Sequence, residues 1–166
     1  MKERLTRRLV QSSDEAFLFE LYASTREREL ERLPWDDDQR KSFLMMQFVA
    51  QSQDYRRRFP DGIHELMLWD GQPAGRLYLA RSEKEIRILD IALMPEYQNW
   101  GIGGAIIREL LNEASETRRP VRIYVEQNNP ALHLFERLGF LIVQDIGSHL
   151  LLEWQDNDSR CMIRDA

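Results

Sequence analysis

Three glycines in four positions are the feature of this chain that most directly indicates chemistry. Gly101, Gly103 and Gly104 follow the apolar run 89–93 and open an amphipathic run that begins at Ile102. Glycines at the start of a helix leave the unpaired N–H groups of the first turn uncovered, and the helix dipole adds partial positive charge there. Such a terminus binds phosphate groups. The pattern therefore predicts a site for a phosphate-bearing molecule.

One interpretation of this turn is a dinucleotide site of the Rossmann type. Gly101-Ile-Gly103 lies between an expected strand and helix, and Glu126 ends the next strand, where a ribose-binding acid belongs. However, Ile106 occupies the third glycine position, where close packing of helix on strand needs a small residue. Too few strand–helix units also follow the turn for a doubly wound sheet. This interpretation is kept as an alternative.

Two motifs in sequence order favour a different interpretation. Gln98-Asn-Trp-Gly101-Ile-Gly103 matches the pattern Gln/Arg-x-x-Gly-x-Gly/Ala, and Ile-Ala-Leu-Met-Pro-Glu-Tyr precedes it at 91–97. Further on, the run 128–140 contains Asn-x-x-Ala, then an aromatic residue, then Gly-Phe. Both motifs, with a helix and a strand between them, resemble the GNAT acetyltransferase superfamily. The resemblance covers residues 4–154, almost the whole chain.

The resemblance implies an α/β (α+β) fold with a mixed, mostly antiparallel central sheet of about seven strands, flanked by about four helices. It also implies an N-acetyltransferase that moves an acetyl group from acetyl-CoA to a primary amine by direct attack. A backbone N–H near Leu93 would stabilise the oxyanion that forms during this attack. The cofactor contacts implied by the resemblance are Ile91, Ala92, Leu93, Gln98, Asn99, Trp100, Gly101, Ile102, Gly103, Gly104, Asn128 and Phe135.

The chain departs from the family pattern at the groups that move protons. Phe135 stands where many members carry a tyrosine that protonates the departing thiolate, and phenylalanine has no hydroxyl. Arg87 stands where some members carry a glutamate base, so Asp90 is the nearest acid on that strand and a candidate base. A paired or edge-exposed Asp90 is the competing interpretation. These departures leave open a GNAT-like module that binds CoA without turnover.

Periodicity predicts the elements that must position these residues. We expect helices at 13–26, after the capping box Ser12–Glu15, at 38–58, from the glycine turn to 116, and from Pro130 to Gly139. We expect strands at 5–10, 65–69, 74–80, 86–93, 121–125, 141–146 and 149–154. Asp70-Gly71 and Gly147 are typical hairpin turns.

Composition limits the class of protein and its partners. A formal net charge of −5 argues against a nucleic-acid binder that works through bulk charge. The single cysteine, Cys161, excludes an intrachain disulfide and a Cys-rich metal site, and the three histidines lack metal-ligand spacing, so we expect no metal. We expect one domain at 1–155 with a polar tail at 156–166.

The chain has neither the apolar segment of a signal peptide nor a membrane-spanning run, so we expect a cytoplasmic protein without a membrane partner. The acceptor would be a small-molecule or peptide amine, and homodimer formation stays open. In this family the first two helices and the last hairpin largely recognise the acceptor. Trp35 and the acidic run Asp36–Asp38 lie there, either as a rim that attracts an amine or as a solvated helix start.

Overall fold

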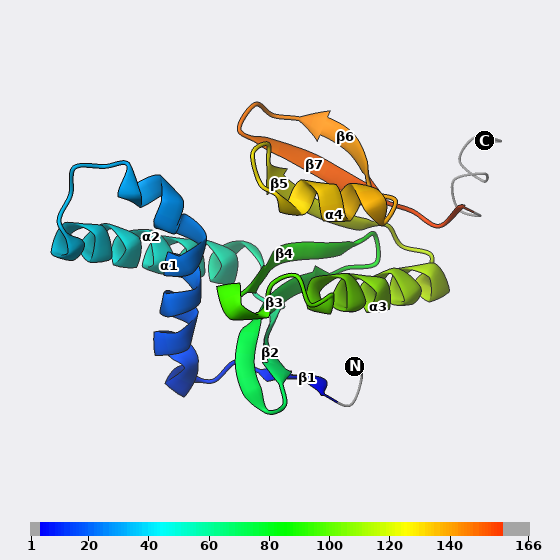
Figure 1. Cartoon of the computed structure of the whole chain (residues 1–166). Coiled ribbons are helices and arrows are strands. Elements are labelled where there is room, and N and C mark those ends of the chain that lie inside the picture. The colour runs from blue at the N-terminus through cyan, green and yellow to red at the C-terminus, as the bar shows by residue number, and fades with distance from the viewer. Residues whose placement is uncertain (1–3, 158–166) are drawn as a thin grey trace. The chain divides into compact units, whose positions relative to one another are not determined.

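The computed structural model of the chain describes residues 4–157, which contain seven strands, four α-helices and two short 3₁₀ helices (Figure 1). In chain order they are β1 (Leu5–Leu9), η1 (Ser12–Asp14), α1 (Glu15–Glu31), α2 (Asp37–Arg58), β2 (Ile63–Trp69), β3 (Gln72–Arg81), β4 (Ile86–Leu93), η2 (Pro95–Tyr97), α3 (Ile102–Thr117), β5 (Val121–Glu126), α4 (Ala131–Arg137), β6 (Leu141–Asp145) and β7 (His149–Trp154).

The seven strands form one sheet in the order β1-β2-β3-β4-β5-β7-β6. β1 pairs with β2, β5 with β7 and β6 with β7, all antiparallel, whereas β4 and β5 pair in parallel. A parallel pair needs a crossover connection, and α3 provides it. The predicted mixed, mostly antiparallel sheet is confirmed. The Rossmann alternative is wrong, because that fold requires a mostly parallel sheet.

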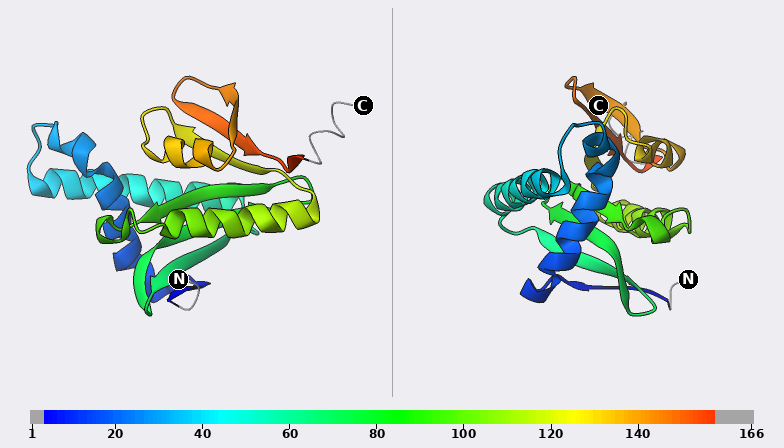
Figure 2. Two further views of the ribbon diagram at one scale, coloured as in Figure 1. Left: turned by 45° about the vertical axis from the view of Figure 1, so that its right-hand side comes forward. Right: turned by 60° about the vertical axis from the view of Figure 1, so that its left-hand side comes forward.

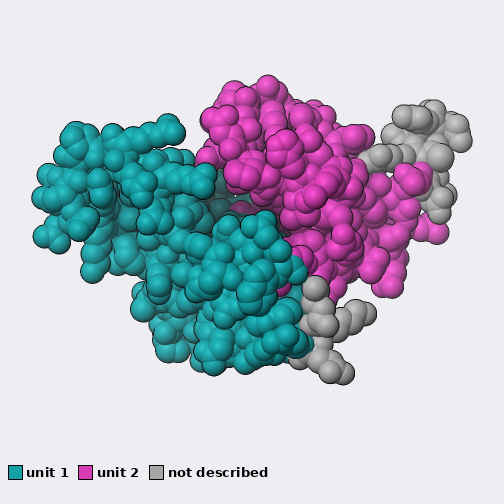
Figure 3. Space-filling model, viewed as in Figure 1, with its two compact units in different colours: residues 1–78, 90–100 teal, residues 79–89, 101–166 magenta. Residues whose placement is uncertain are grey.

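The chain divides into two compact units (Figure 3). Unit 1 comprises residues 1–78 and 90–100, and unit 2 comprises residues 79–89 and 101–166, of which 158–166 lie outside the described part. β3 and β4 each contribute residues to both units. The predicted polar tail falls mostly outside the described residues.

The core of unit 1 lies where α1 and α2 cross (Figure 2). It contains Leu18, Tyr22, Leu30, Leu44, Phe48 and Leu66. The ring of Phe48 contacts those of Tyr22 and Phe19, with centroids 5.6 and 5.8 Å apart. α1 continues to Glu31 rather than ending near Arg26, because Leu30 joins this core and residues 27–31 are good helix formers.

The core of unit 2 is built on one face of α3. The four positions that periodicity predicts for this face, Ile102, Ile106, Leu110 and Ala114, are each 1% exposed. Spacings of three and four residues place them in one stripe along the helix. The strand residues buried with them include Ile86, Ile88, Val121 and Ile123. The stripe therefore fixes the orientation of α3 within unit 2.

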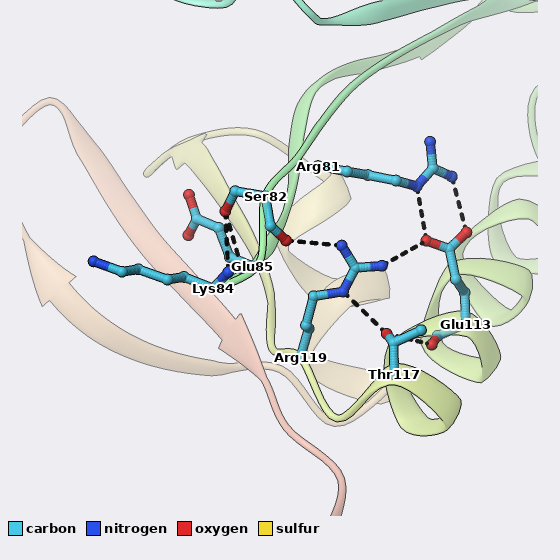
Figure 4. Close-up of polar contacts among 7 residues, drawn as sticks. All are labelled: Arg81, Ser82, Lys84, Glu85, Glu113, Thr117 and Arg119. Carbon is cyan, nitrogen blue, oxygen red and sulfur yellow. Dashed lines mark hydrogen bonds and ion pairs between the residues drawn. The ribbon is translucent and has the colours of Figure 1, made fainter.

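A polar cluster in unit 2 joins the β3–β4 connection to the end of α3 (Figure 4). Arg81 donates two hydrogen bonds to the Glu113 carboxylate, at 2.7 and 2.9 Å. Arg119 donates to the Ser82 carbonyl at 2.8 Å and to the same Glu113 at 3.4 Å. The Ser82 hydroxyl accepts from the backbone N–H groups of residues 84 and 85. The cluster fixes the end of α3 that lies away from the glycine turn.

Candidate functional site

The segment between β4 and α3 has the backbone conformation that the glycine pattern predicts. Asn99 and Gly101 have φ values of +67° and +81°, a region that glycine and asparagine adopt more easily than other residues. Gly101 is the N-cap of α3, and its carbonyl accepts from the Ala105 N–H at 3.0 Å. The N–H groups of the residues between them have no acceptor within the helix.

Packing within the protein does not require glycine in the first turn of α3. A Cβ added to Gly103 would lie 3.7 Å from the Leu134 side chain, an ordinary van der Waals contact. A Cβ added to Gly104 would lie 3.3 Å from the flexible guanidinium of Arg108. Close packing of helix on strand therefore does not explain these glycines. Bare backbone at this turn suits a ligand that approaches the main chain.

Side chains of the turn fasten it to the rest of unit 1. Gln98 Nε2 donates to the carbonyl of Leu93 at 3.0 Å, which ties the turn to the end of β4. Trp100 contacts Trp69 and Tyr97 edge-on, with ring centroids 5.7 and 5.5 Å apart, yet 49% of its surface stays exposed. The tryptophan thus packs against its own unit and still presents an aromatic surface beside the glycines.

Gly75 of β3 is a further residue on which the end of β4 depends. A Cβ at Gly75 would lie 2.1 Å from the Ala92 carbonyl oxygen and 3.0 Å from the Leu93 Cα. The Met94 N–H also donates to the Ala74 carbonyl at 2.8 Å, which holds the two strands together here. Sequence reasoning missed Gly75, although a lone glycine in an apolar strand indicates a close backbone approach.

Asp90 lies in unit 1 and forms an ion pair with Arg76, which is 3% exposed. Arg76 Nε donates to Asp90 Oδ2 at 2.6 Å, and Arg76 Nη2 donates to Gln51 Oε1 at 2.7 Å. To accept a proton from a substrate at Oδ2, Asp90 would have to give up a contact with this guanidinium. The role of Asp90 as a base stays a prediction.

Asn128 and Phe135 lie in unit 2. Asn128 is exposed after β5, whereas the Oδ1 of the neighbouring Asn129 accepts from the Ala131 N–H at 2.9 Å, next to Pro130, the N-cap of α4. The Asn128 side chain is consequently not the cap of this helix. Phe135 is 1% exposed and packs edge-on against Phe140, with centroids 5.1 Å apart. Phe135 therefore belongs to the core of this unit.

A cavity of about 520 Å³ lies at the start of α2, lined by Trp35, Asp36, Asp38, Gln39 and Ser42. Asp36 is also the N-cap of α2, because its Oδ1 accepts from the Gln39 N–H at 2.8 Å and Gln39 Oε1 accepts from the Asp36 N–H at 3.0 Å. Trp35 packs edge-on against Phe43. The acidic run therefore starts a helix and also lines a cavity.

Residues 4–157 contain neither a metal-ligand cluster nor a helix able to span a membrane. Between residues 4 and 157, no cluster of three or more His, Cys, Asp or Glu side chains is arranged to bind a metal ion. Within the same range, no helix combines the length and the apolar character required to cross a bilayer. Cys161 lies outside the described residues.

The open mixed sheet, with the glycine turn between β4 and α3, is a fold of the GNAT type. Residues 16–140 match the model of the Acetyltransferase (GNAT) family, and the chain belongs to this family.

Solved structures share the fold. The PaiA N-acetyltransferase of Thermoplasma acidophilum, crystallised with coenzyme A, is 17% identical, with a TM-score of 0.68 over 92% of this chain and 99% of its own. A GNAT acetyltransferase of Elizabethkingia anophelis with acetyl-CoA bound is 16% identical, with a TM-score of 0.55 over 93% and 99%. At these identities the likeness concerns the fold alone.

A curated relative is similar over a shorter stretch. The tRNA(Met) cytidine acetyltransferase TmcA of Actinobacillus pleuropneumoniae serotype 5b (strain L20) is 34% identical over 74 residues. The match covers 42% of this chain but 12% of that relative. The similarity therefore concerns one small part of a much longer protein.

Proposed function

We propose that this protein is an N-acetyltransferase that transfers the acetyl group of acetyl-CoA to a primary amine. The observation that carries the proposal is the turn from Gln98 to Gly104, whose positive-φ residues and glycines present the unpaired N–H groups of α3. Two structures of the same fold contain coenzyme A or acetyl-CoA. An anionic pyrophosphate is the chemical group that such a helix terminus stabilises.

In this proposal the chain binds acetyl-CoA mainly through its backbone. The pyrophosphate contacts the N–H groups of residues 98–104, and the pantetheine arm runs along Ile91, Ala92 and Leu93. Asn128, whose side chain is exposed, is available for a further contact. A backbone N–H near Leu93 stabilises the oxyanion, and Gly75 supports it by letting β3 approach the Ala92 carbonyl.

The acceptor amine attacks in its neutral form, because an ammonium has no lone pair. A base, directly or through water, therefore removes a proton. The C–N bond forms, the C–S bond breaks and the CoA thiolate leaves. Phe135 cannot donate a proton, but a thiol with a reference pKa of ~8.5 can leave as thiolate and take its proton from water. The cavity with Trp35, Asp36 and Asp38 supports a cationic amine as the acceptor.

The cofactor site is tested by calorimetry of acetyl-CoA binding to Gly103→Glu and, as a matched control, Gly103→Ala. The glutamate adds bulk and negative charge at the helix terminus, so we expect at least a hundredfold loss of affinity. The alanine makes only an ordinary contact with Leu134, and we expect its affinity to stay within about tenfold. Undiminished binding to the glutamate variant would rule out the turn as the pyrophosphate site.

Turnover is tested separately, by thiol release from acetyl-CoA in the presence of a panel of primary amines. Release that depends on one of the amines supports the transferase. The alternative is a GNAT-like module that binds CoA without turnover, favoured by Phe135 and by the ion pair at Asp90. Binding of CoA with no amine-dependent release across peptides, polyamines and small amines would favour this alternative.

A further inference from the structure

A second cavity, of about 270 Å³, lies within unit 1. The start of α1, the C-terminal half of α2 and the strands β2 and β3 contribute its walls. Leu18 and Phe48 form an apolar part of the lining. Its volume is just below the ~300–1,000 Å³ of pockets for drug-sized ligands, so the cavity suits a small metabolite. The proposed reaction makes no use of this cavity.

One polar side chain on the wall, that of His64, has unused hydrogen-bonding capacity. His64 Nε2 is buried and has no hydrogen-bond partner within residues 4–157. Its ring stacks on Tyr78 at 4.3 Å and 12°, and Tyr78 is 8% exposed. Burial, with a contribution from Arg76, lowers the pKa of His64 to about 4, so the ring is neutral at neutral pH. An unpaired buried nitrogen costs free energy that a bound molecule can recover.

The charges on the wall divide into satisfied and unsatisfied groups. Arg76 is paired with Asp90 and hydrogen-bonded to Gln51. Glu15 of α1 and Arg56 of α2 also line the cavity, and neither has an ion-pair partner within 4.0 Å in the described part of the chain. One unpaired carboxylate and one unpaired guanidinium therefore share a cavity with an apolar patch.

We propose that this cavity binds a small zwitterion with an apolar body, a neutral α-amino acid. Its carboxylate accepts hydrogen bonds from Arg56 and from His64 Nε2, and its ammonium donates to Glu15. Its side chain packs on Leu18 and Phe48. The residues that line this cavity include none of the residues to which we assign acetyl-CoA binding. The cavity is a second ligand site, independent of the proposed acetyl transfer.

The test is calorimetry with L-leucine as the probe, and with two analogues that each lack one charge. Leucinamide has no carboxylate, and 4-methylpentanoate has no amine. We expect L-leucine to bind and each analogue to bind at least tenfold more weakly. A titration with the other proteinogenic amino acids covers a different side-chain preference. Absence of binding by all twenty would overturn the proposal, as would equal binding of leucinamide or 4-methylpentanoate.

Variants connect the binding to the two unpaired charges. Arg56→Gln and Glu15→Gln change exposed side chains that have no ion-pair partner within residues 4–157, so we expect intact folding and at least a tenfold loss of affinity for the amino acid. Arg57→Gln is the matched control, because Arg57 lies next in the same helix and does not line the cavity. Unchanged affinity in both charge variants would reject the site. Acetyl-CoA calorimetry on the same samples keeps this outcome separate from a failure of the proposed function.

Discussion

The two units treat polar groups in opposite ways. Among residues 4–157, the buried charged side chains are Asp14 and Arg76, and both belong to unit 1. Asp14 is held by two hydrogen bonds from Arg8 at 2.8 Å, and Arg76 is held by Asp90 and Gln51. Unit 2 buries only apolar side chains in its described part, and the ion pairs of Arg81, Arg119 and Arg122 stay partly exposed.

The difference indicates that the two units recognise ligands by different groups. A buried charge is costly unless it is paired and hydrogen-bonded, so apolar packing is the simpler way to stabilise a fold. Unit 2 is stabilised by apolar packing. This packing fixes α3, whose first turn presents backbone N–H donors. Unit 1 keeps paired charges, a neutral histidine and two unpaired charges around a cavity. Specific recognition by side chains is therefore expected from unit 1, and recognition by backbone from α3.

The largest expected effect on the free energy of unfolding comes from replacing one glycine in each unit by alanine. Gly75→Ala forces a Cβ to 2.1 Å from the Ala92 carbonyl, and because the obstacle is backbone we expect a loss of at least about 3 kcal/mol in the free energy of unfolding. Gly103→Ala meets nothing closer than 3.7 Å and replaces a helical glycine, so we expect no loss and a gain of up to about 1 kcal/mol. Urea denaturation measures both. Equal effects would contradict the close approach at Gly75.

The next effect compares two arginines. Arg76→Met leaves Asp90 without its partner, and we expect the free energy of unfolding to fall by about 2–3 kcal/mol. This is less than the ~3–5 kcal/mol of fully buried pairs, because the Asp90 side chain is 28% exposed. Arg122→Met breaks contacts with Glu85 and Glu153 that are partly solvated, so we expect about 1 kcal/mol. Urea denaturation measures the free energy of unfolding of both variants. A larger loss for the Arg122 variant than for the Arg76 variant would contradict the expected order.

The same division explains which features could be predicted from sequence. β4 and β7 lie at the predicted residues, and all four predicted face positions of α3 are buried, because local periodicity encodes them. The glycine turn is likewise a local sequence pattern, so it could also be predicted. The bonds of Arg76 to Gln51 and Asp90 span 25 and 14 residues, so no local pattern announces them.

Errors in the sequence interpretation also come from long-range packing. Sequence periodicity predicts the end of α1 five residues too early, because the burial of Leu30 depends on contacts with other elements. The capping box was expected to start at Ser12, whereas the Gln11 N–H donates to the Asp14 carboxylate one residue earlier. The ion pair with Arg8 draws Asp14 into this arrangement.

Lowering the pH should reduce the free energy of unfolding through titratable groups of unit 1. The pKa of His64 is lowered to about 4 by burial and by Arg76, so between pH 6.5 and 4 the unfolded chain takes up a proton that the folded chain does not. Stability is therefore full above about pH 6.5 and falls toward pH 4. At ~1.4 kcal/mol per pKa unit, reduced for partial exposure, we expect a loss of about 2 kcal/mol.

His64→Gln separates this effect from that of Asp14. The ion pair with Arg8 lowers the pKa of Asp14 to about 2, so its contribution is present above pH 3.8 and is lost only as the pH falls toward 2. The glutamine variant should thus lose the decline between pH 6.5 and 4 and keep the one below it. Urea denaturation at pH 7, 5.5, 4.5 and 3 measures both windows. A decline of unchanged size in the variant would assign it to another group.

The smallest effect is expected from Phe135→Tyr in unit 2. The added hydroxyl enters an apolar core at a residue that is 1% exposed, and an unsatisfied hydroxyl should cost about 1 kcal/mol. If the proposed CoA thiolate lies near this position, the hydroxyl gains a partner, and saturating CoA should remove the cost. Because a thiolate leaves without prior protonation, we expect amine-dependent thiol release to rise less than tenfold. A larger rise would mean that proton transfer to sulfur limits the wild-type rate, and the apolar core of unit 2 would then be the cause of that limit.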